Sequence, residues 1–143
     1  LGNYDAALAD FQHLAELEPE NPLPYLEQGW TFLDHLNQPQ EAIEAFDRAI
    51  AINQETAEAY LGRGNALRAL DADPQEALDA WSSCVAYNPH QYWCYFDLAN
   101  LYDELGQIDE AVANFQLYLE YVDETDCIEC QQDAEAYIDD HGG

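Results

Sequence analysis

The stretch that decides the fold is AEAYLGRGNALRALDADPQEALDAWSSCVAYNP, residues 57–89, which holds two helical patterns joined by a short turn and ends in proline. The same pattern precedes and follows it. Four series of residues recur at a spacing of 34 or 35: Tyr25, Tyr60 and Tyr95; Gly29, Gly64 and Ala99; Ala7, Ala42, Ala77 and Ala111; Phe11, Phe46, Trp81 and Phe115. Self-similarity at this period indicates an array in which each unit buries its apolar face against the next.

The order of residue types inside one unit is also informative. The first helix has an aromatic residue and then a small residue four positions later, and the second helix has an alanine and then an aromatic residue. The unit ends in a proline after the second helix, as at Pro19 and Pro89, or in another residue at that position, such as Gln54. Over Gly2 to about Val122 this order resembles the tetratricopeptide repeat. The resemblance implies an all-α fold in which tandem antiparallel helix pairs stack as a right-handed superhelix.

The spacing divides the chain into an array and a cap. We expect a half repeat at 1–21, repeats at 22–56, 57–91 and 92–123, and a C-terminal capping helix with a tail at 124–143. The first unit lacks its first helix, so part of the face formed by Ala7, Phe11 and Leu14 is expected to be bare, for upstream residues or another chain to cover. The last helix lacks the repeat signature and is interpreted as the polar-backed cap that such arrays need for solubility.

The charge balance restricts the partners. Thirty acidic residues stand against three arginines, which gives a formal net charge of -27. This charge repels nucleic acid and anionic lipid, so we expect neither as a partner. We also expect no membrane insertion, because no apolar run approaches the ~20 residues of a membrane span. The acidity either attracts a basic partner or cations, or it serves solubility or adaptation to a salty environment, and the second interpretation is favoured.

Four cysteines form two candidate disulfide pairs. Cys84 and Cys94 are predicted to face each other across a turn between two helices, where they either bridge or pack as small buried side chains. Cys127 and Cys130 form a C-x-x-C motif at a helix start, a position that lowers the thiol pKa in redox enzymes. Because the neighbouring residues are acidic, a local disulfide or two free thiols is favoured over redox catalysis. The even cysteine count slightly favours an extracytoplasmic setting.

The sequence offers no catalytic constellation. It contains no nucleophile–base pair and no phosphate-binding loop, and its four histidines are scattered. A zinc site needs four ligands, whereas only His141 and distant acids accompany the C-x-x-C pair. We therefore expect no enzymatic activity, no cofactor and no metal site.

The resemblance implies protein–protein interaction through a concave groove lined by the first helix of each repeat. One position beyond the packing face of those helices runs a row of apolar, aromatic and polar side chains, which we name the first-helix row. It consists of Leu23, Leu26, Trp30, Leu33, Leu61, Asn65, Arg68, Trp93, Phe96, Asn100 and Asp103. We expect Trp30 and Phe96 to be partly exposed anchors and the two asparagines to hydrogen-bond a peptide backbone. The predicted partner is a protein or peptide with apolar or basic side chains. The alternative is a self-associating scaffold that uses the bare first helix and the cap.

Overall fold

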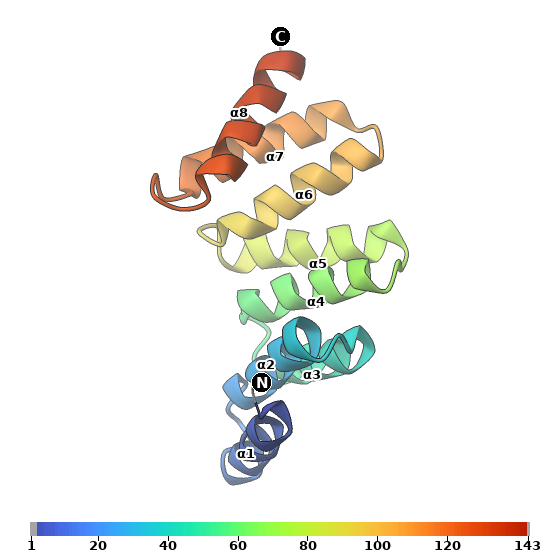
Figure 1. Cartoon of the computed structure of the whole chain (residues 1–143), viewed down its shortest axis with the longest axis vertical. Helices are drawn as coiled ribbons and strands as arrows, with labels where there is room; N and C mark the ends of the chain where they lie inside the picture. Colours follow the sequence, from blue (N-terminus) through green and yellow to red (C-terminus); the bar gives the residue numbers. More distant parts are fainter. Residues whose placement is uncertain (1–2, 143) are drawn as a thin grey trace.

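The computed structural model describes residues 3–142 as a ladder of helices that ascends from one end of the molecule to the other (Figure 1). Its elements are α1 (Tyr4–Leu17), α2 (Leu23–Trp30) with the π-helical turn η1 (Thr31–His35), α3 (Pro39–Ile52), α4 (Ala57–Ala69), α5 (Pro74–Tyr87), α6 (Tyr92–Glu104), α7 (Ile108–Tyr121) and α8 (Ile128–His141). Between residues 3 and 142 there is no strand. The predicted all-α superhelix of antiparallel pairs with a capping helix is confirmed.

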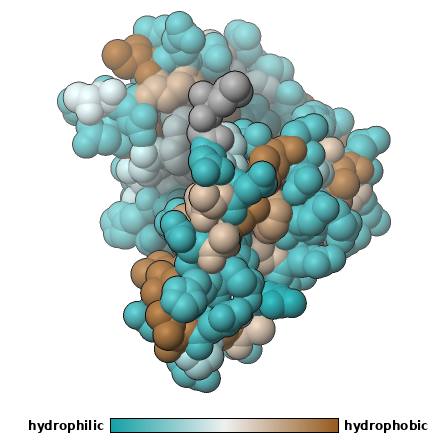
Figure 2. Space-filling view, turned by 60° about the horizontal axis from the view of Figure 1, so that its bottom comes forward, coloured by the Kyte–Doolittle hydropathy of each residue, from teal (hydrophilic) through white to brown (hydrophobic). Residues whose placement is uncertain are grey.

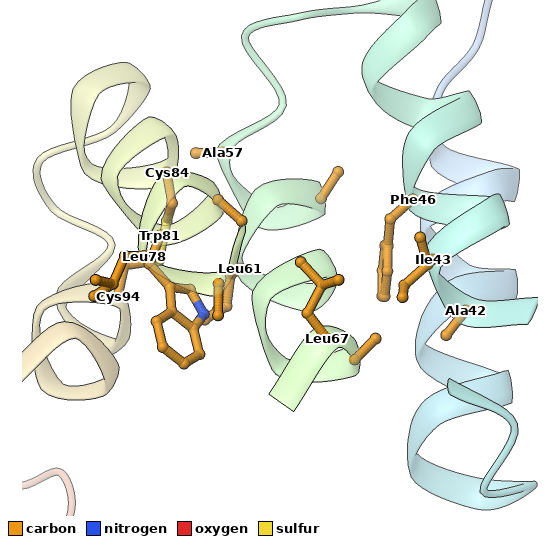
Figure 3. Packing of buried hydrophobic residues seen from close by; sticks show 14 of the residues in the cluster. Ala42, Ile43, Phe46, Ala57, Leu61, Leu67, Leu78, Trp81, Cys84 and Cys94 are labelled. Carbon is orange, nitrogen blue, oxygen red and sulfur yellow. A yellow bond between two sulfur atoms is a disulfide. The ribbon is translucent and has the colours of Figure 1, made fainter. Parts of the chain in front are cut away.

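Small residues let the helices cross closely where large rings are buried. The Phe46 ring of α3 is fully buried between Gly29 on α2 and Gly62 on α4. A Cβ atom at Gly29 would lie 2.5 Å from Phe46 Cε1, and a Cβ atom at Gly62 would overlap the same ring. Trp81 on α5 lies in the same way against Gly64, so that the two rings flank α4 (Figure 3). A larger residue at these positions would force the helices apart.

Each first helix ends in the same kind of turn, which contains one residue in the left-handed region of backbone conformation. The residue after it donates its amide to a carbonyl in the last helical turn, at 2.8–3.1 Å. The left-handed residues are Asn37, Asp71 and Gly106, with φ of 52°, 52° and 71°. Asparagine, aspartate and glycine are the residues that tolerate this conformation best.

Repeats 2 and 3 are each one residue longer than repeat 4, but they accommodate the additional residue in different places. In repeat 3 it lies in the turn, between Asp71 and the helix-capping residue Asp73. In repeat 2 it lies inside the first helix, where the amide of Leu36 donates to the carbonyl of Thr31, five residues back, at 3.2 Å. The additional residue is accommodated by the π-helical turn η1, which the spacing pattern did not predict.

The C-terminal half of the array is cross-linked and capped. A disulfide joins Cys84 at the end of α5 to Cys94 at the start of α6, with 6.5 Å between the Cα atoms. A second disulfide, Cys127–Cys130, lies at the start of α8. Helix α8 packs on α7 through Ala134, which is fully buried, and most of its remaining residues are polar and exposed. In the described part of the chain, no helix has the length and apolar character that a membrane crossing requires.

Candidate partner-binding surface

Burial divides the first-helix row into a covered part and an accessible part. Leu26 and Leu61 are only 3% and 7% exposed and belong to the core, so the expectation that they line a free surface is wrong. The reason is that their side chains pack into the cluster shared by α2, α3, α4 and α5. By contrast, Leu23 is 55% exposed. The large side chains that are half buried are Trp30, Leu33, Trp93 and Phe96.

The polar members of the row already have partners inside the protein. Asn65 Oδ1 accepts a hydrogen bond from Trp81 Nε1 at 3.0 Å, so this asparagine holds the buried indole in place. Asn100 donates to the carbonyl of Phe96 in its own helix at 2.8 Å. A partner backbone would have to compete with these bonds. The sequence spacing predicts that both asparagines belong to the row, but it does not predict these hydrogen bonds within the protein.

The two charged members of the row connect elements of the array. Arg68 on α4 pairs with Glu104 at the end of α6, with 2.6 Å between nitrogen and oxygen. Asp103 accepts a hydrogen bond from the Tyr137 hydroxyl of α8 at 2.6 Å. Arg68 therefore does not present a free positive charge. The hydrogen bond between Tyr137 and Asp103 also connects the capping helix α8 to α6, the first helix of repeat 4.

The aromatic members form two separate patches. On α6 the rings of Trp93 and Phe96 lie 5.8 Å apart edge to face, and both contact the ring of the fully buried Tyr118 at 6.0 and 5.0 Å. On α2 the ring of Trp30 lies 5.2 Å from Phe46, also edge to face. Within the described chain, neither Trp30 Nε1 nor the Tyr118 hydroxyl has a hydrogen-bond partner. The accessible apolar side chains of the row thus lie on α2 and α6, whereas its accessible side chains on α4 are polar.

One carboxylate on α6, that of Asp97, is partly buried. Asp97 on α6 follows Gly62 by 35 residues and so occupies the equivalent position of its repeat. Burial raises the pKa of the Asp97 carboxyl to about 7. This carboxyl therefore titrates near neutral pH, unlike an exposed aspartate.

The C-x-x-C pair has a neighbourhood that does not favour thiol chemistry. The Asp126 carboxylate accepts hydrogen bonds from the Cys127 amide at 2.9 Å and from the Tyr92 hydroxyl. A negative charge in this position opposes formation of a thiolate. Among residues 3–142 no group of three or more histidine, cysteine, aspartate or glutamate side chains is arranged to hold a metal ion.

Helix pairs with this packing define an α-solenoid. Family models described as tetratricopeptide repeat match the chain, one at residues 1–55 and 26–81 and another at residues 69–125. Since these matches cover more than half of the chain, the protein belongs to the tetratricopeptide repeat family. It is accordingly a protein–protein interaction module, of a kind that is generally non-enzymatic. No curated protein sequence matches it.

Solved structures share the fold over nearly the whole chain. A crystal structure of MamA is 26% identical with a TM-score of 0.80, and the match covers 99% of this chain and 80% of MamA. MamA from Desulfovibrio magneticus RS-1 is 23% identical, with a TM-score of 0.77 and coverage of 99% and 79%. YrrB, described as a TPR protein with an unusual peptide-binding site, is 22% identical, with a TM-score of 0.77 and coverage of 92% and 66%. The last two likenesses concern the fold alone.

Proposed function

We propose that the accessible part of the first-helix row binds a segment of a partner protein. The observation that carries this proposal is that Trp30, Leu33, Trp93 and Phe96, although they pack against the core, keep part of their surface exposed on the first helices of an otherwise acidic chain. Large apolar side chains in such a position are typical of interaction sites, and tryptophan is enriched among the residues that dominate binding energy. YrrB, which shares the fold, is described as having a peptide-binding site.

The charges around the row favour a partner segment that combines apolar and basic side chains. Asp34, Glu58 and Asp103 are exposed on the same helices, and Arg68 is occupied by Glu104. Lysine or arginine residues of the partner would meet uncompensated carboxylates. Association would then be fast at low salt and would weaken as ionic strength rises.

The test is selection of peptides from a random 12-residue display library, followed by titration of the selected peptides against variants. Trp30→Ala and Phe96→Ala should each weaken binding by at least tenfold, since loss of an aromatic anchor costs about 2 kcal/mol or more. Leu105→Ala is the matched control, because Leu105 is 42% exposed but lies outside the row. If Trp30→Ala and Phe96→Ala bind like the parent, as the control should, the row is not the site.

Self-association is a second candidate, and a specific observation favours it. Leu14, Leu17 and Leu23 are 37%, 66% and 55% exposed near the α1 end of the ladder. The view that brings this end forward shows hydrophobic patches within the hydrophilic surface (Figure 2). The charge of -27 on each copy opposes assembly, so association should increase with salt as repulsion is screened. Sedimentation velocity at low and high salt tests this, and Leu17→Glu should abolish any assembly.

A further inference from the structure

In repeats 3 and 4 a tyrosine near the start of the first helix is stacked by a tyrosine from the end of the second helix. The rings of Tyr60 and Tyr87 lie 5.4 Å apart with 20° between their planes, and those of Tyr95 and Tyr121 lie 5.7 Å apart with 12°. Burial, and then the neighbouring hydroxyl, raises the pKa of Tyr60 and of Tyr95. Each pair therefore covers a tyrosine face that would otherwise contact water.

Repeat 2 has the first tyrosine but lacks the second. Tyr25 is the equivalent of Tyr60, while Ile52 stands 35 residues before Tyr87. A pocket of about 310 Å³ opens at this place, lined by Pro19, Tyr25, Arg48, Ala51 and Ile52. An engineered cavity of about 150 Å³ is enough to hold benzene, so the pocket has room for a ring and a small polar group.

The pocket also contains a positive charge that the other repeats lack. Arg48 Cζ lies 5.8 Å from the centre of the Tyr25 ring, and the Arg48 side chain is exposed. Arg63 pairs with Asp47 and Arg68 pairs with Glu104, whereas Arg48 has no ion-pair partner in the described part of the chain. The equivalent positions of repeats 3 and 4 hold Ser83 and Leu117. The arginine is thus a feature of repeat 2 and not of the other repeats, and it also borders a neighbouring pocket that is lined by Glu41 and Glu44.

We propose that this pocket binds an aromatic side chain of a partner protein that is followed directly by an acidic residue. The ring would stack on Tyr25 in the place that Tyr87 occupies beside Tyr60, and aromatic pairs of this kind are favourable beyond the area they bury. The carboxylate would pair with Arg48, the one guanidinium without an ion pair between residues 3 and 142. The pocket shares no residue with the first-helix row. A negative result at one of the two surfaces would therefore not contradict the proposal for the other.

Three capped hexapeptides separate the contributions of the ring and of the carboxylate. They have the form acetyl-Gly-Ser-X-Z-Ser-Gly-amide, where X-Z is Phe-Asp, Phe-Asn or Leu-Asp. Binding would be followed by the backbone amide shifts of Tyr25, Arg48 and Ile52 in NMR titrations. A salt concentration of about 0.3 M screens the repulsion between an acidic peptide and an acidic chain. We expect the Phe-Asp peptide to bind at least fivefold more tightly than either of the others. Equal affinity of all three peptides would overturn the proposal.

Four variants complete the test. Ile52→Tyr places in repeat 2 the side chain that fills this space in repeat 3, so it should weaken Phe-Asp binding at least tenfold without changing the helical circular dichroism spectrum. Arg48→Gln should remove the preference for Phe-Asp over Phe-Asn. Arg63→Gln is the control for loss of an arginine elsewhere and should leave all three affinities unchanged.

The fourth variant is the reverse exchange. Tyr87→Ile should open a new slot beside Tyr60 that binds Phe-Asp and Phe-Asn equally, because Ser83 stands where Arg48 stands in repeat 2. If Ile52→Tyr binds the Phe-Asp peptide as tightly as the parent does, the pocket is not the site and the proposal is wrong.

Discussion

Two of the places where a second helix meets the first helix of the following repeat, α3 with α4 and α5 with α6, obey one pattern but are stabilised differently. Where α3 meets α4, Gly62 lies directly against the Phe46 ring. Where α5 meets α6, the equivalent residue is Asp97, and the Cys84–Cys94 disulfide joins the two helices. Helix α4 also packs more extensively on α3 than α6 does on α5. The repeat determines the geometry of the crossing, whereas close packing stabilises one crossing and a covalent bond the other.

The largest effect is expected at the crossing that relies on packing alone. Phe46→Ala should lower the free energy of unfolding by about 3–5 kcal/mol, because the cavity it leaves is flanked by Gly29 and Gly62, which have no side chains to fill it. Denaturant unfolding followed by circular dichroism measures this. Phe46→Leu keeps much of the volume and should cost less than half as much. Equal losses for both variants would show that the ring does not fill this space.

The next effect is expected at the cross-linked crossing. Replacing Cys84 and Cys94 together by alanine should cost about 2–3 kcal/mol, since the bridge closes a loop with a sequence separation of 10. Replacing Cys127 and Cys130 by alanine is the matched control and should cost less, because that separation is only 3. A reducing agent should destabilise the parent much more than the Cys84 and Cys94 double variant, which retains only the Cys127–Cys130 bridge. A double variant as stable as the oxidised parent would contradict the assigned role of the bridge.

The fold was predictable because its determinants are periodic. The tyrosine, glycine, alanine and aromatic series each place one side chain per repeat at a helix crossing, and rings such as Phe46 and Trp81 lie where that spacing puts them. The turn η1 was not predictable in this way. One additional residue can be accommodated in a turn, as at Asp71–Asp73, or within a helix, as at Thr31–His35, and the period is the same in both cases.

The candidate site was less predictable than the fold. Spacing places Leu26 and Leu61 on the same helix face as Trp30, but burial of that face depends on how far the adjacent helices cover it. Likewise, the bond between Asn65 and Trp81 joins residues 16 positions apart on different helices. Such contacts arise from tertiary packing and not from the period. The pocket beside Tyr25 likewise depends on tertiary packing, because it lies where the later repeats place the second ring of a stacked tyrosine pair.

The third effect is a difference in pH dependence between the two crossings. Burial raises the pKa of Asp97 to about 7 from its ordinary value of 3.8. The folded state therefore holds this proton more tightly than the unfolded state, so the free energy of unfolding falls as pH rises from about 4 to 7 and stays low above that. Asp97→Asn should match the parent at pH 4 and exceed its stability by about 1–2 kcal/mol at pH 8.

The measurement is a set of urea unfolding curves between about pH 4 and pH 8. Because the chain has a net charge of -27, removal of any carboxylate reduces repulsion, and Glu44→Gln on the exposed face of α3 controls for this general effect. The Asp97→Asn gain should grow with pH well beyond the gain from Glu44→Gln. Parallel curves for the two variants would show that Asp97 is not desolvated in the folded protein.

The smallest effect concerns the tyrosine pair that repeat 3 has and repeat 2 lacks. Ile52→Tyr should raise the free energy of unfolding by about 0.5–1.5 kcal/mol, because a second ring would cover the open face of Tyr25. Tyr87 is itself 45% exposed, which places the expected gain in the lower half of that range. The reverse exchange, Tyr87→Ile, should lower the stability by a similar amount, and thermal unfolding of both variants beside the parent measures the difference. Opposite and equal changes would mean that the stacked pair can be transferred between repeats, as expected for an array whose units contribute nearly independently. If Ile52→Tyr destabilises the protein instead, the space beside Tyr25 is not shaped for a ring, and the proposed aromatic-binding pocket loses its basis.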